Sequence, residues 1–458
     1  MKIALVELAS HNRVNFYSLI NMPRGVPNLA AILEKDGHEV TCFVESIQKF
    51  DWRQLLDYPV IGFSAITCTI IPTYNIIRQL RHEGYKGTII LGGPHPTALP
   101  EEGLPAGADY VVRHEGDKTL SRLIRALEKG EPVESVLGIS YLRNGQVVHN
   151  GDQEYLTEEE LSALPPPAFE TIRGYEKMRQ VPLNFSRGCP FRCKFCAVAS
   201  MFGGAYRSIS VEARLRMLRY VKENFPEIWR KSIVFFTDDN FFGDLRSKKV
   251  TISFMEEMIR QNLIPPKGWM CQARVGDISA ENANLMARAG CKYICSGVET
   301  TDLKALKAFN KGQTPEQIRN SIKNAHSSGI RVVAMMVIGC DEDTFWSVLK
   351  SVYRAKTWGI DFLQLLALVP LPGTVLTKEL ESEKRIISHD YDKYNGHYVV
   401  VRPKKMGPFR VWAALWLLTF WFYFLTANGR KLMRDFGKEF FKMVLMIGHH
   451  WTFGSMRK

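Results

Sequence analysis

The chain has 458 residues, 46% hydrophobic and 23% charged, so it is long enough for about three domains and has the composition of a globular protein, not a disordered or fibrous one. Nine cysteines are too few for a secreted disulfide scaffold, and their odd number excludes complete pairing. The net charge of +13 lies mostly near the carboxyl end, which does not fit a basic nucleic-acid channel, and no nucleic-acid partner is expected. Because the chain opens on a strand-like run and not on a signal peptide, we expect a cytoplasmic location.

Residues 1–150 alternate short apolar runs with segments of helical periodicity. Strands are expected at Ile3–Leu8, Glu39–Glu45, Val60–Ser64, Thr88–Leu91 and Ala108–Val112, helices at Val26–Asp36, Pro72–Glu83 and Lys118–Lys129, and a hairpin at Gly138–Val148 with Asn144-Gly145 as its turn. This alternation predicts an α/β fold with a doubly wound, Rossmann-like parallel sheet. Ligands of such a sheet bind beyond the carboxyl ends of its strands.

Three consecutive prolines, Pro165 to Pro167, indicate a stiff linker, which we place at residues 151–180. A second β/α alternation follows at residues 181–375. Its strands are expected at Leu183–Ser186, Ile233–Thr237, Trp269–Ala273, Tyr293–Val298, Val332–Ile338 and Phe362–Leu368. Six strands with intervening helices predict a partial (β/α)6 barrel, with its chemistry at the carboxyl ends of the strands.

The last region, residues 376–458, is expected to be helical, basic and rich in aromatic residues. Residues 402–458 hold eleven Lys/Arg against two Asp/Glu, a net charge of +9, and these charges surround the uncharged stretch 411–429. As a helix, that stretch would be about 28 Å long. Three interpretations stay open, namely a helix in the membrane interface or against an apolar substrate, an ordinary buried helix, and a membrane span. Residues 431–450 have an amphipathic pattern, for which a solvated helical cap is the alternative.

Three cysteines, Cys189, Cys193 and Cys196, follow the first strand of the second unit on a loop that contains Gly188 and Pro190. Three thiols within eight residues can converge on one metal centre, and thiolates are the ligands that iron–sulfur clusters and zinc prefer. A structural zinc site usually needs a second Cys-x-x-Cys pair, and none lies nearby. Three ligands to a four-iron cube would leave one iron open for an exogenous ligand.

The spacing of these cysteines after the first strand of a β/α barrel resembles the radical S-adenosylmethionine (SAM) enzymes. The resemblance implies that they hold a [4Fe–4S] cluster whose open iron takes the amino and carboxylate groups of SAM, which one electron then cleaves to methionine and a 5′-deoxyadenosyl radical. The segments Phe236–Phe241, Gly297–Thr300 and Pro370–Thr374 also resemble the family, whereas Ile338–Glu342 departs from its usual sequence and puts the fit around adenine in doubt. The SAM contacts implied in this way are Phe195, Thr237, Asp238, Arg274 and Glu299. For the three charged residues among them, a structural ion pair or helix cap is the alternative.

Three earlier segments, Val60–Thr69, Leu91–Thr97 and Arg113–Thr119, resemble the cobalamin-binding domain of the cobalamin-dependent radical SAM enzymes. The cobalamin contacts implied are Ser64, Thr67, Thr69, Gly92, Gly93, His95, Thr97, Glu115 and Gly116. Glycines let the backbone approach a bulky ligand, and hydroxyls bond its amides and phosphate. The first loop lacks the Asp-x-His-x-x-Gly motif that supplies cobalt with a histidine, so we expect His11 to be a surface residue and the lower face of cobalt to be open or approached by another residue.

Cys291 and Cys295 have the same parity as Glu299 on one expected strand, and Cys271 lies on the strand before. If Glu299 faces the barrel interior, the three thiols could hold an auxiliary cluster or donate hydrogen. The alternative, which we favour, is that they are small buried hydrophobic residues.

The resemblance as a whole predicts an enzyme that methylates an unactivated carbon of a small apolar substrate such as a lipid, isoprenoid or tetrapyrrole. The alternatives are a non-methylating cyclase or oxidoreductase with the same cofactors and, outside catalysis, a cobalamin or iron–sulfur sensor. The partners expected are a reductant such as ferredoxin or flavodoxin and the inner face of the membrane, to which the chain would bind peripherally.

Overall fold

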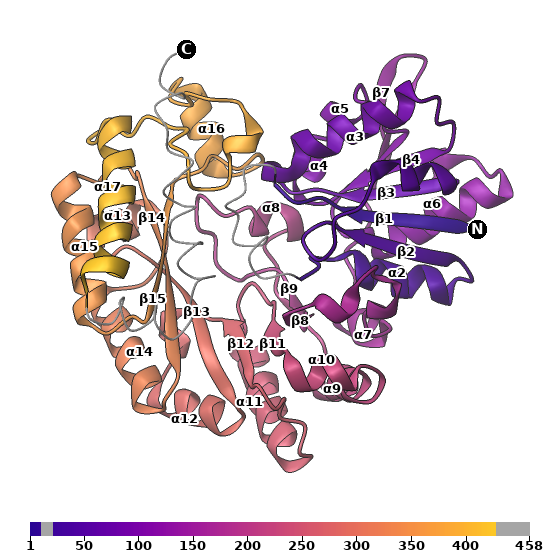
Figure 1. The fold of residues 1–458 in the computed structure, drawn as a ribbon. Coiled ribbons are helices and arrows are strands. Elements are labelled where there is room, and N and C mark those ends of the chain that lie inside the picture. Colours follow the sequence, from indigo (N-terminus) through magenta and orange to yellow (C-terminus); the bar gives the residue numbers. More distant parts are fainter. Residues whose placement is uncertain (11–21, 427–458) are drawn as a thin grey trace.

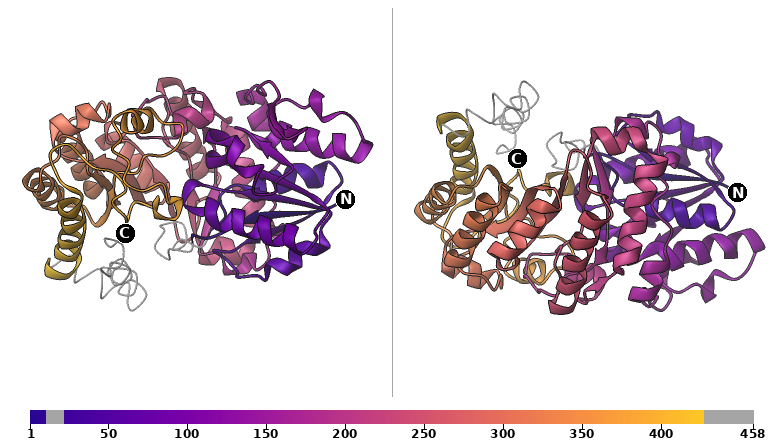
Figure 2. Two further views of the ribbon diagram at one scale, coloured as in Figure 1. Left: turned by 90° about the horizontal axis from the view of Figure 1, so that it is seen from above. Right: turned by 90° about the horizontal axis from the view of Figure 1, so that it is seen from below.

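The structure is a computed structural model and describes residues 1–10 and 22–426. Two α/β units lie side by side, the amino-terminal unit in indigo and violet and the second unit from magenta to orange (Figure 1). Helix α17 lies at the end of the molecule remote from the amino terminus (Figure 2). His11 and the predicted amphipathic segment 431–450 lie outside the described residues.

The amino-terminal unit contains a seven-stranded sheet in the order β2-β1-β3-β4-β5-β6-β7. Its strands are β1 (Lys2–Glu7), β2 (Glu39–Val44), β3 (Val60–Ser64), β4 (Thr88–Gly92), β5 (Tyr110–Val112), β6 (Ile139–Arg143) and β7 (Gln146–His149). Its helices are α2 (Val26–Lys35), α3 (Ile70–His82), α4 (Pro94–Ala98), α5 (Pro100–Gly103) and α6 (Gly116–Lys129). β1 to β5 are parallel and β6–β7 is an antiparallel hairpin, so the predicted doubly wound sheet is confirmed. Because β1 lies between β2 and β3, the winding reverses between β1 and β3, where such sheets bind ligands.

The buried carboxylate of Glu7, at the carboxyl end of β1, fixes the start of α2. It accepts hydrogen bonds from the backbone N–H groups of Arg24 (2.7 Å), Gly25 (2.8 Å) and Val26 (3.1 Å). The first N–H groups of a helix have no partner within the helix and need such an acceptor.

The segment between the two sheets follows the surface of the first unit. It includes α7 (Glu158–Ala163), which the hydroxyl of Thr157 caps by accepting a hydrogen bond from the Glu160 N–H. Farther along, the N–H of Ala168 donates to the carbonyl of Pro27 and that of Arg173 to the carbonyl of Cys42. These bonds tie the segment to α2 and β2.

The second unit is a parallel six-stranded sheet in the order β15-β14-β13-β12-β11-β8. Its strands are β8 (Gln180–Leu183), β11 (Ile233–Phe236), β12 (Trp269–Gln272), β13 (Cys291–Glu299), β14 (Arg331–Ile338) and β15 (Phe362–Ala367). The helices of this unit are α9 (Val211–Asn224), α10 (Pro226–Lys231), α11 (Leu245–Arg260), α12 (Ala280–Arg288), α13 (Leu303–Ala308), α14 (Pro315–Ser327) and α15 (Phe345–Thr357). Within the described residues β8 and β15 are unpaired on their outer sides, which confirms a partial barrel.

The prediction of a first barrel strand at Leu183–Ser186 is wrong. β8 ends at Leu183, and Ser186–Arg187 forms the separate strand β9, which pairs with β10 (Arg207–Ser208) in a two-stranded ribbon. The chain leaves the sheet because the N–H of Phe185 donates to the side chain of Asp238 (2.9 Å) and not to a neighbouring strand. The alternation of apolar residues at Val181, Leu183 and Phe185 continues past this point, so the sequence pattern does not mark the exit.

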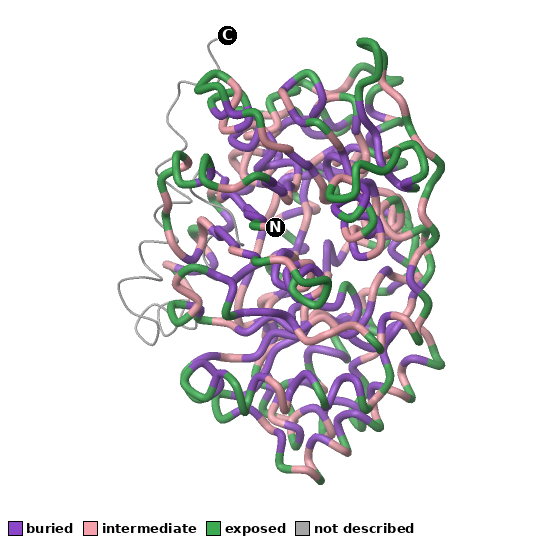
Figure 3. Tube along the Cα trace, turned by 90° about the vertical axis from the view of Figure 1, so that its right-hand side faces the viewer, coloured by how far each residue is buried: buried purple, intermediate pink, exposed green. Residues whose placement is uncertain are grey.

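Buried residues concentrate on the strands and on the helix faces that cover them (Figure 3). The indole of Trp269, the largest fully buried side chain, lies between β12 and its helices and donates to the carbonyl of Ala289 (2.7 Å).

The carboxyl-terminal region packs on the barrel through α16 (Val375–Ser382), α17 (Pro408–Phe420) and a π-helical turn at Trp421–Leu425. Pro408–Leu425 is the single described stretch with the length and hydropathy of a membrane span, and 39% of it is buried inside the protein. A core helix of a globular protein meets the same criteria. The hydroxyl of Tyr423 accepts a hydrogen bond from the Leu363 N–H (3.0 Å) and donates to the Leu363 carbonyl (2.7 Å), so the turn is anchored to β15.

The substitution Tyr423→Phe should lower the free energy of unfolding by about 1–3 kcal/mol, because it leaves a buried N–H and carbonyl of an edge strand without partners. Chemical denaturation measures the effect. Tyr353→Phe, at an exposed position on α15, is the matched control and should change stability by less than about 0.5 kcal/mol. Equal effects of the two substitutions would contradict the anchoring role.

Candidate functional site

The loop 188–206 carries Cys189, Cys193 and Cys196 beyond the carboxyl end of β8 and holds them partly exposed. One side of the loop is fixed to the barrel. The N–H of Lys194 donates to the Phe309 carbonyl (3.1 Å), and the side-chain amide of Asn310 donates to the Arg192 carbonyl (2.9 Å). The ring of Phe195, a predicted SAM contact, packs on Phe309 with a centroid distance of 5.1 Å.

The three thiols are electrostatic neighbours. Burial raises the pKa of Cys196 to about 12, and Asp239, Cys193 and Cys189 act in the same direction. Burial also raises the pKa of Cys189. Among the described residues, no group of three His, Cys, Asp or Glu is close enough to hold a single metal ion. A four-iron cube binds each thiolate through a different iron, so neighbouring but separated thiols fit a cluster better than they fit zinc.

Two consecutive aspartates at the end of β11 have different environments. Asp238 is fully buried, and its Oδ1 accepts hydrogen bonds from Phe185 N (2.9 Å) and Ser186 Oγ (2.5 Å). Burial raises the pKa of Asp238 to about 6, and burial together with repulsion from Asp238 raises that of Asp239 to about 7. Asp239 remains open to solvent although protein surrounds it, and it acts electrostatically on Cys189 and Cys196. The family resemblance pointed to Asp238, which is buried in the structure. Asp239 is the carboxylate that lies near the cysteines, and the sequence does not distinguish the two.

Three charged residues gather at the ends of β12 and β13. Glu299 has a left-handed backbone (φ 58°) at an irregularity in the pairing of β13 with β14, and its Oε1 lies 2.6 Å from the ammonium of Lys311. Arg274 donates to the carbonyls of Lys311 and Gly312, and its guanidinium lies 3.6 Å from the centroid of the Phe191 ring in the cysteine loop. Left-handed non-glycine residues are a recurrent feature of binding sites. Lys311 was not predicted, because it is twelve residues from its partner and no local motif marks it.

A partly unpartnered group lies beside these charges. Gln313 donates from its amide nitrogen to the carbonyls of Gly297 and Val298 (3.1 Å each). Its buried Oε1 has no hydrogen-bond partner among the described residues. Thr237, the remaining predicted SAM contact, donates to the Leu183 carbonyl through its N–H (2.9 Å) and, more weakly, through its hydroxyl (3.3 Å). The structure therefore brings all five predicted SAM contacts to the carboxyl edge of the barrel.

The residues predicted to contact cobalamin lie at the carboxyl ends of β3, β4 and β5. Gly93 has φ 106°, and a Cβ there would meet the Ala65 carbonyl oxygen at 2.6 Å, so no other residue fits between these strand ends. Ser64 and Gly92 are partly exposed, as ligand contacts require. The hydroxyl of Thr97 accepts a hydrogen bond from His114 N (2.8 Å). Thr67 and Thr69 are buried in the turn after β3, where the Thr69 hydroxyl bonds to the backbone of Ile66.

His95 is fully buried. Its Nε2 lies 3.2 Å from Glu102 Oε2, its ring meets Tyr391 edge-on at 4.7 Å, and its Nδ1 has no hydrogen-bond partner in the part of the chain that is described. Tyr391 comes from the carboxyl-terminal region and donates to Glu102 Oε1 (3.1 Å). An unpartnered ring nitrogen at this edge suits a polar ligand group.

Glu115 and Gly116 lie where β5 meets α6, but the Glu115 carboxylate already has protein partners. Its oxygens accept from Arg207 Nη2 (2.8 Å), Arg207 Nη1 (3.1 Å) and Leu156 N (2.9 Å). The Glu115 side chain thus has its hydrogen-bond partners within the protein, and the contact of these two residues with cobalamin stays a prediction.

Cys271, Cys291 and Cys295 are all buried in hydrophobic clusters, as the favoured interpretation expects, and they do not all lie on the inward face of the barrel. The β12–β13 pairing is irregular next to Trp269, and this changes the face on which Cys291 lies. Cys271 and Cys291 are neighbours in the core between sheet and helices, whereas Cys295 lies in a separate cluster with Phe235 and Met270. The three thiols fill core positions as small apolar side chains.

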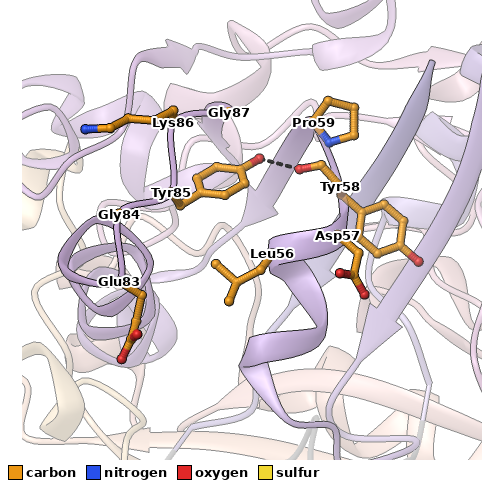
Figure 4. A pocket seen from close by; sticks show the side chains of 9 residues that line it. All are labelled: Leu56, Asp57, Tyr58, Pro59, Glu83, Gly84, Tyr85, Lys86 and Gly87. Carbon is orange, nitrogen blue, oxygen red and sulfur yellow. Dashed lines mark hydrogen bonds between the residues drawn. The ribbon is translucent and has the colours of Figure 1, made fainter.

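A surface depression of about 580 Å³ lies at the opposite edge of the amino-terminal sheet, where β3 and β4 begin (Figure 4). Tyr85 crosses it and donates its hydroxyl proton to the Tyr58 carbonyl (2.6 Å). Since it is at the amino ends of the strands, it takes no part in the site described above.

Residues 17–124 match the B12 binding domain, and residues 183–352 match the radical SAM superfamily. The B12-binding match covers the strand ends that carry the predicted cobalamin contacts, and the radical SAM match covers the cysteine loop. The chain belongs to the cobalamin-dependent radical SAM enzymes. Its cofactors are a [4Fe–4S] cluster, SAM and cobalamin.

Relatives of this radical SAM enzyme include an uncharacterized methyltransferase of Pyrococcus horikoshii, 27% identical over 81% of this chain and 81% of the relative. An anaerobic magnesium-protoporphyrin IX monomethyl ester cyclase of Rubrivivax gelatinosus is 25% identical over 84% of this chain and 70% of the cyclase. A bacteriochlorophyllide d C-12(1)-methyltransferase of Chlorobaculum tepidum is 24% identical over 85% of this chain and 79% of that enzyme.

Two solved structures share the fold of this enzyme. The radical SAM methyltransferase TsrM of Kitasatospora setae aligns with a TM-score of 0.67 at 17% identity over 83% of this chain and 76% of TsrM. The cobalamin-dependent radical SAM enzyme OxsB aligns with a TM-score of 0.74 at 18% identity over 98% of this chain and 71% of OxsB.

The raised pKa of Asp239 has a consequence for the cofactor-free protein. A carboxyl group whose pKa is higher in the folded than in the unfolded state favours folding below the unfolded value near 4 and loses this contribution as the pH rises to about 7. The substitution Asp239→Asn should therefore raise the melting temperature relative to the wild type at pH 8 and change it little at pH 4. Thermal melts at the two pH values measure this, and an equal effect at both would contradict it.

Proposed function

We propose that this radical SAM enzyme is a C-methyltransferase that adds a methyl group to an unactivated carbon of an apolar substrate. The observation that carries the proposal is that the two cofactor edges lie against each other. Helix α4, which follows the Gly92-Gly93 turn of the cobalamin domain, contacts α8 (Val198–Phe202) of the cysteine loop. His114 Nδ1 lies 3.0 Å from the carbonyl oxygen of Met201 in that helix. Chemistry that passes from one cofactor to the other requires this proximity.

The inward face of the barrel supports an apolar substrate. Along β14, Val332, Ala334, Met336 and Ile338 are buried against the helices, while the alternate residues are partly exposed on the inward face. The partly exposed apolar residues of β13 to β15 are Tyr293, Val333, Met335, Val337, Phe362 and Leu366. The polar side chains that are at least partly exposed on these strands are Gln364 and, at the strand starts, Lys292 and Arg331. A face of this composition binds a hydrophobic molecule and keeps water out.

When bound, the cluster with SAM would supply hydrogen-atom abstraction and cobalamin would supply the methyl group. Cys189, Cys193 and Cys196 would hold the cluster. Asp239, the Glu299–Lys311 pair and Arg274 present charges of both signs, which suit the ammonium and carboxylate groups of SAM. The apolar inward face would exclude water from the reacting atoms. The chemistry needs a reductant, for which we propose a ferredoxin or flavodoxin.

The second candidate is a cyclase or oxidoreductase that uses the same cofactors without adding methyl. The similarity to a magnesium-protoporphyrin IX monomethyl ester cyclase over 84% of this chain favours it. Both candidates use an apolar substrate, and the named substrates of the two characterized relatives described above are tetrapyrroles.

Methyl-labelled SAM separates the two candidates. The chain, reconstituted anaerobically with iron, sulfide and cobalamin, should transfer label to a component of a lipid or tetrapyrrole extract and release 5′-deoxyadenosine. The variant Cys193→Ser should lose bound iron and activity, whereas Cys340→Ser, a buried cysteine outside the loop, should keep its iron. A modified product without label would exclude methyl transfer, and the absence of 5′-deoxyadenosine would leave only a sensor.

We also propose that α17 binds the surface of an anionic membrane, from which an apolar substrate could be taken. Phe409, Leu417, Phe420 and Leu425 are between 43% and 60% exposed, and Trp346 on the neighbouring α15 is 74% exposed. The chain that follows, residues 427–458, carries seven Lys/Arg and two Asp/Glu. Exposed aromatic residues beside basic charge fit the interface of an anionic bilayer.

Sedimentation with vesicles tests the membrane proposal. The chain should bind phosphatidylglycerol vesicles more tightly than phosphatidylcholine vesicles, and the triple change Phe409→Ser, Leu417→Ser and Phe420→Ser should weaken binding by about tenfold or more. Leu137→Ser with Leu142→Ser, two exposed leucines of the cobalamin domain, is the matched control. Failure to bind either vesicle, or concentration-dependent dimerisation through this face, would overturn the proposal.

A further inference from the structure

The loop that carries the three cysteines is closed at its base by the ribbon β9–β10. We call this ribbon the stem of the loop. Arg187 of β9 lies directly opposite Arg207 of β10, so the stem carries two guanidinium groups on neighbouring strands. Like charges opposite each other on paired strands are destabilising. Both side chains are also largely buried, at 16% and 12% exposure, so water does not screen their repulsion.

The cobalamin domain supplies the opposite charges. Asp117, in the first turn of α6, accepts a two-pronged pair of hydrogen bonds from Arg187 at 2.6 and 2.9 Å. Glu115, just before the helix, accepts two from Arg207 and lies 3.5 Å from Arg187. Each carboxylate is only 5% exposed. The four residues form a buried cluster of two positive and two negative charges, which we name the stem cluster.

The positive and negative charges of the stem cluster neutralise each other only when the cobalamin domain is docked on the loop. Burial by itself raises the pKa of Asp117, but the guanidinium of Arg187 outweighs it and holds the pKa below its ordinary value. A buried charge that loses its partner is strongly destabilising. Without the two carboxylates, the stem would therefore contain two unpaired, opposed cations and would tend to open.

Above the stem, the loop is held by a contact between its own two ends and by Tyr155, which precedes the barrel in the chain. Gly188 has φ 85°, and a Cβ there would come within 1.9 Å of the Ala205 carbonyl oxygen, so the two ends of the loop touch just above the stem. Tyr155 donates its hydroxyl proton to the Met201 carbonyl (3.2 Å), and its ring lies 4.8 Å from the Arg207 guanidinium. The cysteine loop is thus closed at its base and supported along one side by the amino-terminal part of the chain.

We propose that Glu115 and Asp117 are positioning residues for the iron–sulfur cluster: by neutralising Arg187 and Arg207 they close the stem of loop 188–206, so that docking of the cobalamin domain holds the three cysteines in place. This inference rests on the proposed function only in assigning the loop to the cluster. It makes the cobalamin domain a structural part of the cluster site as well as the holder of the second cofactor.

Thiol alkylation of the cofactor-free full chain tests the proposal without any need for activity. In the double variant Glu115→Gln and Asp117→Asn, the alkylation rates of Cys189, Cys193 and Cys196, followed by peptide mass spectrometry, should rise by about tenfold or more. The rates of the six other cysteines should not change. The variant Asp341→Asn removes a comparable two-pronged pair with Arg385 that lies outside the stem, and it should leave the loop thiols at wild-type rates.

A triple variant separates charge neutralisation from general loosening. Adding Arg207→Gln to the double variant removes the repulsion between the two arginines and should return most of the protection of the loop thiols. Iron release from the reconstituted cluster to a chelator should follow the same order of variants.

Three results would overturn the proposal. They are unchanged loop reactivity in the double variant, equal exposure of all nine cysteines, and no recovery in the triple variant. A loss of cobalamin affinity without a change in thiol reactivity would assign Glu115 and Asp117 to the cofactor instead. None of these results depends on methyl transfer, so failure here is distinguishable from failure of the proposed function.

Discussion

Parallel β-sheets place the carboxyl ends of all their strands at one edge, and both units of this chain are built under that constraint. Residues far apart in sequence, such as Ser64 and Gly93 in one unit or Asp239 and Glu299 in the other, reach a common edge only because their strands run in the same direction. The two edges then lie against each other through α4 and α8.

Charged side chains gather at the carboxyl edge of the barrel. Asp239 has a raised pKa and lies beside the cysteines, and Glu299 keeps a left-handed backbone while paired with Lys311. An ordinary domain avoids such groups, because each lowers the stability of the fold. Their concentration at the barrel edge indicates that bound cofactors complete their interactions.

The two units share a continuous apolar core through the segment that links them, in which Phe169 packs on Phe225. The contact between the units also contains arginine–carboxylate pairs and bonds to the Met201 carbonyl. Polar pairs of this type have strict geometry, so they fix the orientation of two bodies more precisely than apolar contact does. Tyr391 fixes the carboxyl-terminal region in a similar way, through a hydrogen bond to Glu102 and an edge-on ring contact with His95.

Hydrophobic periodicity and short motifs were enough to predict the two α/β units, most strand positions and the cysteine loop, because both are local properties of the chain. The sequence did not determine which of Asp238 and Asp239 faces the cysteines, where β8 ends, or that Cys291 lies on the helix side of its sheet. Those outcomes depend on a side-chain hydrogen bond from another strand and on an irregular strand pairing. Lys311 and the Arg187–Asp117 pair were equally invisible, since residues 12 and 70 positions apart meet only after the sheets have formed and docked.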